Sequence, residues 1–156
     1  MPRPLLYILG TFCGTGFAPI APATVASFAV TVLWFLAWIW LGPIPIWLNA
    51  VLICVVTLVG VPVASRLERI HGQDPSLVVI DEVAGMLVTF LGVSTGAVGW
   101  LLAFFWFRFF DIFKPLGIRR LEKLDGGLGI MADDLGAGVL ACICTHVSLR
   151  LLWWWA

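Results

Sequence analysis

The chain has 156 residues, of which 62% are hydrophobic and only 12% charged, and its nine basic residues balance its nine acidic ones. A mean hydropathy of +1.06 excludes an ordinary water-soluble globular protein, in which roughly a quarter of the residues are charged. The net charge of zero excludes the broad basic face that binds nucleic acid. We therefore expect a single membrane-embedded domain over residues 1–156, with the lipid bilayer as its partner.

The apolar segments predict an all-α bundle of about five transmembrane or partly re-entrant helices. A short apolar stretch after Arg3 predicts an N-terminal helix in the membrane interface. Five longer apolar segments follow, at residues 25–41, 46–64, 77–91, 100–110 and 135–155. About 20 residues are needed to cross the hydrocarbon core. The third and fourth segments are near the lower length limit, so they either cross the bilayer or form a shallow re-entrant hairpin.

Basic and aromatic residues together predict the orientation of these segments. All but one of the basic residues fall on one side of the five segments, and the exception is Arg150 near the C-terminus. Because basic loops stay in the cytoplasm, this side should be cytoplasmic. Tryptophan is enriched at membrane interfaces, and a group of tryptophans lies near the opposite ends of the segments: Trp38, Trp40, Trp47, Trp100, Trp153, Trp154 and Trp155.

Five carboxylates should meet at the cytoplasmic end of the bundle. Asp81 and Glu82 begin the third segment, Asp111 ends the fourth, and Asp133 and Asp134 precede the fifth. Carboxylates this close repel one another, so the cluster requires cations. Arginine, lysine or a divalent metal could supply them, and a set of oxygen ligands favours Mg²⁺ over Mn²⁺ or Ca²⁺.

Two basic residues flank one of these acids at helical spacing. Arg108, Asp111 and Lys114 follow one another at intervals of three, which places them on one face of a helix. The arginine fork and the lysine charge suit a phosphomonoester, while Asp111 orients them or binds metal. The alternative is that both bases are ordinary residues whose charges reach the interface at a helix end.

A Gly/Pro-rich loop before the first long segment is a second candidate for phosphate binding. Thr24 or Ser27 could cap the helix that follows, and N–H groups at a helix start bind anions. Plain capping is the alternative. His71 and His146 are isolated, and the four cysteines show no metal-binding spacing, so we expect no catalytic or metal role for them.

Four motifs together give a more specific signal than any acidic pair alone. They are Ala21–Thr24, Ile80–Met86, Phe107–Pro115 and Gly126–Asp134, within a region from about Gly14 to Gly138. In content and order they resemble the phosphatidylglycerophosphatase A family. The resemblance implies a Mg²⁺-dependent phosphatase of the bacterial inner membrane, whose active site faces the cytoplasm and converts phosphatidylglycerophosphate to phosphatidylglycerol.

The resemblance and the residue chemistry combine in one hypothesis. Arg108 and Lys114, with Thr24 and Ser27, would bind the terminal phosphate, and Asp111 would complete either this set or the metal site. We favour water over an aspartyl-phosphate route as the nucleophile. The Mg²⁺ ligands would be Asp81, Glu82, Asp133 and Asp134.

Two other membrane functions remain open from the sequence. A phosphotransferase that moves a phospho-alcohol group carries its acids along one or two helices, whereas here they are divided among three segment ends. A non-enzymatic proton or cation transporter would place its charges around a cavity at the bilayer midplane. The expected position of the cluster at one interface suits a lipid headgroup and argues against the transporter. The oligomeric state stays open.

Overall fold

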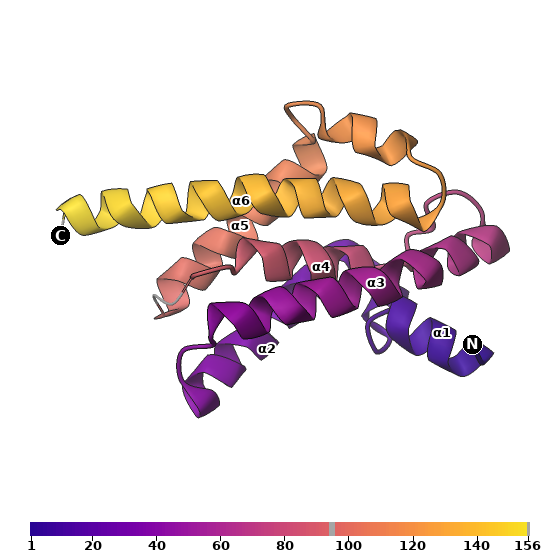
Figure 1. Ribbon diagram of the computed structural model, residues 1–156, viewed down its shortest axis with the longest axis horizontal. Helices are drawn as coiled ribbons and strands as arrows, with labels where there is room; N and C mark the ends of the chain where they lie inside the picture. Colours follow the sequence, from indigo (N-terminus) through magenta and orange to yellow (C-terminus); the bar gives the residue numbers. More distant parts are fainter. Residues whose placement is uncertain (94–95, 156) are drawn as a thin grey trace.

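The computed structural model describes residues 1–93 and 96–155, and its regular secondary structure in these ranges is entirely helical. The predicted all-α membrane bundle is therefore confirmed. Figure 1 shows the N-terminus and the C-terminus at opposite ends of an elongated bundle, with α6 running along most of its length. The α-helices are α1 (Arg3–Gly10), α2 (Pro22–Leu41), α3 (Ile46–His71), α4 (Ile80–Thr89), α5 (Gly96–Phe113) and α6 (Gly127–Trp155), and the 3₁₀ helices are η1 (Thr15–Phe17) and η2 (Ile118–Lys123).

Four of the helices are long and apolar enough to cross a membrane, namely α2, α3, α5 and α6. Much of their apolar surface faces outward. Leu58 on α3, for example, is 75% exposed in the isolated chain. Side chains of this kind are favourable on an outer surface when lipid tails, and not water, cover them. The protein is therefore a membrane protein.

The third predicted segment, residues 77–91, does not form a helix long enough to cross the membrane. Its helix α4 has ten residues, or about 15 Å of helix, which is half of the roughly 30 Å hydrocarbon core. All ten residues are buried, and α4 contacts α2, α3, α5 and α6. The segment is thus an internal half-helix, because the other helices cover its apolar surface and separate it from lipid. Residues 94–95, in the stretch between α4 and α5, lie outside the described residues.

The helices that flank the polar stretches are longer than their apolar segments. Helix α3 passes through Pro62 and continues to His71, and α6 begins at Gly127 instead of near residue 135. Hydropathy marks only the part of a helix that faces lipid, whereas polar residues continue the helix into the interface. As a result, Asp133 and Asp134 lie inside α6 and not in a loop before it.

The predicted N-terminal helix is present as α1 and packs against α3, where Leu6 joins Val63 and Leu67 in one apolar cluster.

Trp100 departs from the predicted interfacial belt. It is 2% exposed, and its ring contacts that of Trp38 with centroids 5.2 Å apart. The side chain of Trp155 lies outside the described part of the chain.

Two glycines allow α4 and α6 to approach closely. A Cβ atom added at Gly138 would lie 2.5 Å from the Gly85 carbonyl oxygen, and one added at Gly85 would lie 2.7 Å from the Asp134 carbonyl oxygen. Small residues at helix contacts in membranes permit this backbone proximity. The contact also fixes the start of α4 beside Asp134.

Candidate active site

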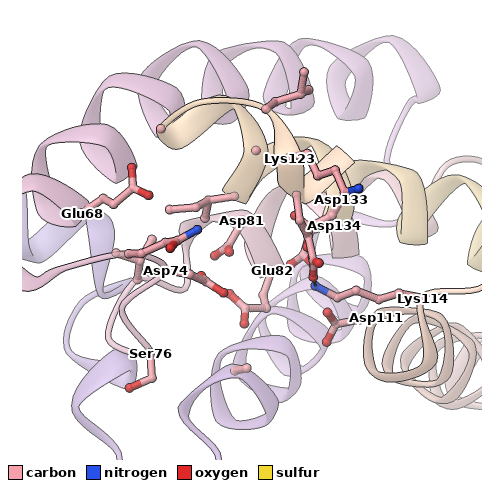
Figure 2. Close-up of a pocket in the computed structure, with 18 of the residues that line it drawn as sticks. Glu68, Asp74, Ser76, Asp81, Glu82, Asp111, Lys114, Lys123, Asp133 and Asp134 are labelled. Carbon is pink, nitrogen blue, oxygen red and sulfur yellow. Dashed lines mark hydrogen bonds and ion pairs between the residues drawn. The ribbon is translucent and has the colours of Figure 1, made fainter. Parts of the chain in front are cut away.

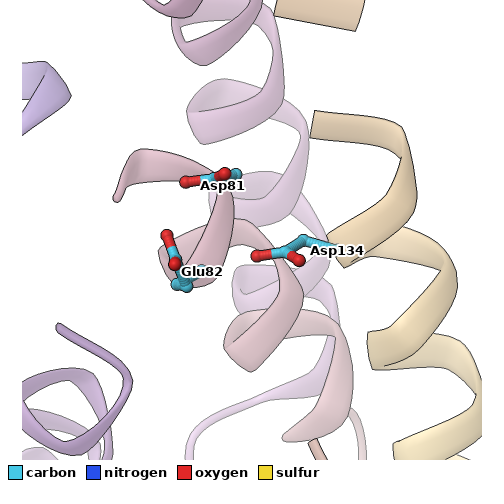
Figure 3. Close-up of side chains that lie close together, drawn as sticks. All are labelled: Asp81, Glu82 and Asp134. Atoms are coloured by element: carbon cyan, nitrogen blue, oxygen red, sulfur yellow. The ribbon is translucent and has the colours of Figure 1, made fainter. Parts of the chain in front are cut away.

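Three buried carboxylates converge where α4 meets α6. Asp81 and Glu82 lie in the first turn of α4, and Asp134 projects from α6, as Figure 3 shows. Each offers an oxygen atom within 4.8 Å of those of the other two, and their exposed fractions are 8%, 6% and 3%. The positive end of the α4 dipole favours its two acids, but it cannot neutralise three charges.

The chemistry of this acid triad fits a divalent cation. Asp81 Oδ1, Glu82 Oε2 and Asp134 Oδ2 are buried without a hydrogen-bond partner, which is costly for ionised groups. Burial, together with the neighbouring Glu82, raises the pKa of Asp81 well above its usual range. Burial, followed by the charges of Asp134 and Asp111, raises the pKa of Glu82 to about 8. A hard cation such as Mg²⁺ takes oxygen ligands of this kind.

Asp133, the fourth predicted metal ligand, has a different partner. Its Oδ2 accepts a hydrogen bond from Lys114 Nζ, which also donates to Glu122 Oε1 at 2.6 Å. Burial lowers the pKa of Lys114, but the bonds to Asp133 and Glu122 outweigh it and the pKa is raised overall. Lys114 therefore stays protonated beside the acid triad. Its backbone has a left-handed φ of 45°, a strained conformation for lysine.

The predicted pair of Arg108 and Asp111 forms a salt bridge. Arg108 Nη1 lies 2.7 Å from Asp111 Oδ2, and both side chains are 14% exposed. Asp111 lines the central cavity and Arg108 does not. The structure therefore places Arg108 behind Asp111, where it fixes the carboxylate.

The predicted phosphate contacts Thr24 and Ser27 do not line the cavity, although Pro22 and Ala23 do. The Ser27 hydroxyl donates to the Ala23 carbonyl oxygen at 2.8 Å and is fully buried. The alternative that one of them caps the helix is wrong, because α2 already begins at Pro22 and its N-cap residue makes no side-chain hydrogen bond.

All five predicted carboxylates line one cavity of about 790 Å³, which also contains Lys114. Figure 2 shows the acid triad near its centre. Sequence reasoning missed further polar residues of the wall, because they come from the end of α3, the loop that follows it, η2 and the turn after η2. Their polarity was the only signal in the sequence, and these residues are Glu68, Gln73, Asp74, Ser76, Glu122, Lys123 and Asp125.

Comparison with known proteins gives related enzymes over nearly the whole chain. A Bacteroides thetaiotaomicron protein, provisionally named a phosphatidylinositol-3-phosphatase, is 39% identical over 95% of this chain and 97% of its own length. Proteins named phosphatidylglycerophosphatase A are 32% identical in Escherichia coli, over 86% of this chain and 78% of the relative, and 35% identical in Haemophilus influenzae, over 88% and 85%. No solved structure matches the chain.

The family model described as phosphatidylglycerophosphatase A matches residues 8–149. This range contains the acid triad, Lys114 and the glycine contact between α4 and α6. The matched relatives are bacterial phosphatases by name. The chain is therefore a membrane phosphatase and belongs to the phosphatidylglycerophosphatase A family.

Proposed function

We propose that the protein hydrolyses the terminal phosphomonoester of phosphatidylglycerophosphate to phosphatidylglycerol, with Mg²⁺ as its cofactor. The names of the E. coli and H. influenzae relatives support this substrate. The observation that carries the chemistry is the buried acid triad beside a charged lysine in one cavity. The basic residues around this end of the bundle support a site on the cytoplasmic face of the bacterial inner membrane.

Asp81, Glu82 and Asp134 would hold the cation. A bound Mg²⁺ supplies charge stabilisation to phosphoryl oxygens during in-line displacement. Lys114 binds the terminal phosphate through its positive charge, and Asp133 holds the lysine in place.

Asp111 is positioned to act on the attacking water. Arg108 holds its Oδ2, so that Oδ1 can accept a proton as the water oxygen bonds to phosphorus. The ester P–O bond then breaks, and the leaving alkoxide takes up a proton to form the glycerol hydroxyl of the product. Inorganic phosphate is the second product.

Removal of metal should abolish this reaction reversibly. The purified protein in detergent is given phosphatidylglycerophosphate, and released inorganic phosphate is measured. We expect EDTA to stop phosphate release and excess Mg²⁺ to restore it, because no basic side chain within residues 1–93 and 96–155 forms an ion pair with the triad carboxylates. Full activity in EDTA would contradict the metal requirement, and no release by metal-replete enzyme would contradict the proposed function.

Lys114→Met should weaken substrate binding more than any other change at a basic residue of the cavity. Hydrogen bonds to charged groups contribute about 1.5–3 kcal/mol, so we expect KM for the lipid to rise by roughly tenfold to a hundredfold. Lys123→Met is the matched control, because Lys123 also lines the cavity but is exposed. Equal effects of the two changes would show that only the net charge of the cavity matters.

The Bacteroides relative supports a second candidate substrate, phosphatidylinositol 3-phosphate, because the match covers almost the full length of both chains. Both lipids carry a phosphomonoester on a hydroxylated headgroup, so the same acid triad and lysine would serve either. Parallel measurement of kcat/KM for the two lipids would decide which one the enzyme prefers.

A further inference from the structure

The cavity is much larger than the phosphate group that reacts in it. Its volume of about 790 Å³ equals that of roughly 26 water molecules at ~30 Å³ each. A phosphate and a cation that keeps several waters fill only part of this space. The remainder has to accommodate the rest of the headgroup or solvent, so the chemistry of its wall indicates which headgroups fit.

The polar groups of the cavity are divided between two sides. Figure 2 shows Lys114 and Asp111 on one side of the acid triad and Glu68, Asp74 and Ser76 on the other. The lysine side attracts the phosphate. The other side offers carboxylate and hydroxyl groups, which repel or only weakly bind an anion but accept hydrogen bonds from neutral hydroxyl groups.

We use the term headgroup wall for Glu68, Gln73, Asp74 and Ser76, which all line the cavity. Within residues 1–93 and 96–155, the side chains of these four residues form no hydrogen bond or ion pair with another part of the chain. Their acceptor and donor groups are therefore available to a ligand. Glu82 lies between this wall and Lys114 (Figure 2). Its side chain is only 6% exposed, and its Oε2 has no hydrogen-bond partner.

The helix that carries Glu68 is joined to the helix that carries Asp134. Ser65, one turn before Glu68 on α3, accepts a hydrogen bond from the Gly127 N–H at the start of α6, with a distance of 2.8 Å. Asp74 has a left-handed φ of 45°, a conformation that aspartate tolerates better than most residues. The Ser65 hydrogen bond therefore sets the position of Glu68 relative to α6, while Asp74 lies in the loop between α3 and α4.

We infer that the headgroup wall binds the hydroxyl groups of the lipid headgroup. It selects phosphomonoester lipids with polyhydroxylated headgroups, including cyclic headgroups that are larger than glycerol. The inference rests on the proposed phosphatase function. Glu68 and Asp74 accept hydrogen bonds from headgroup hydroxyls while Lys114 binds the phosphate at the opposite side. A headgroup with several hydroxyls makes more of these bonds than the single free hydroxyl of phosphatidylglycerophosphate.

Kinetics on two short-chain lipids test this inference. KM and kcat are measured for phosphatidylglycerophosphate and phosphatidylinositol 3-phosphate, together with the inhibition constant of inorganic phosphate, which has no polyol part. The variants are Glu68→Leu and Asp74→Gly, the second of which keeps the left-handed backbone favourable. Glu68→Gln is the conservative variant. Arg69→Gln is the matched control, because Arg69 neighbours Glu68 in sequence but does not line the cavity.

We expect both variants to raise KM for the inositol lipid by about tenfold or more, to raise it less for the glycerol lipid, and to leave kcat and phosphate inhibition unchanged. Glu68→Gln should recover most of the loss, and Arg69→Gln should behave as the parent. Unchanged KM for both lipids, or an equal loss of phosphate inhibition, would overturn the inference. So would a parent enzyme that cleaves phosphatidylglycerophosphate but neither cleaves nor is inhibited by the inositol lipid. A parent enzyme that cleaves neither lipid would overturn the proposed function as well.

Discussion

Asp81→Asn, Glu82→Gln and Asp134→Asn should each lower kcat/KM for phosphatidylglycerophosphate by more than about a hundredfold. Each change removes the charge of one triad oxygen and leaves an amide that is a poor ligand for a hard cation. The measurement is phosphate release by purified protein in detergent at saturating Mg²⁺. Raising the Mg²⁺ concentration should recover part of the activity, since the remaining two carboxylates still bind the ion weakly.

A stability measurement separates this chemical effect from misfolding. The three acids repel one another when no cation is present, so each amide variant should unfold in EDTA at the same temperature as the parent or higher. Asp125→Asn is the matched control for activity, because Asp125 lines the same cavity but is exposed and lies outside the triad. It should retain activity within about twofold. If all three amide variants kept full rate, the triad could not be the metal site.

Gly138→Ala should destabilise the contact between α4 and α6. The new Cβ would lie 2.5 Å from the Gly85 carbonyl oxygen and 3.1 Å from Val88 Cβ. The first of these is a backbone atom, so α4 and α6 have to move apart. Overpacking of this kind costs about 1–3 kcal/mol and occasionally more. We expect a lower unfolding temperature in detergent and a fall in kcat, since the movement separates Asp134 from Asp81 and Glu82.

Gly136→Ala provides the matched control two residues earlier on the same helix. The nearest neighbour of its new Cβ would be Leu121 Cδ1 at 3.0 Å, the end of a flexible side chain that can shift. Alanine also favours a helix interior by about 1 kcal/mol over glycine. The unfolding temperature of this variant should stay the same or rise, and equal destabilisation by both changes would contradict a specific contact between α4 and α6.

The helical class and the grouping of the acids could be predicted because each depends on local composition. Apolar runs such as residues 46–64 have no stable place outside a bilayer or a core. The length of α4 could not be predicted, because its apolar residues are equally compatible with lipid and with the protein interior. Only the packing of four other helices around α4 decides between the two.

The different partners of Asp133 and Asp134 illustrate a second limit. Successive residues of an α-helix point about 100° apart, so one member of an adjacent pair can face the acid triad while the other faces Lys114. The sequence placed both residues before the fifth apolar segment and not within a helix, so it did not separate their roles. The start of α6 at Gly127 depends in part on the distant hydroxyl of Ser65, which accepts the Gly127 N–H.

The complete burial of α4 has a consequence for how the enzyme responds to its membrane. Helices that face lipid adjust their tilt when the bilayer becomes thicker or thinner. Helix α4 meets no lipid, since all ten of its residues are covered by protein, so the depth of Asp81 and Glu82 follows the neighbouring helices and not the thickness of the surrounding lipid. Changes in acyl-chain length thus reach these two carboxylates only through the helices packed around α4.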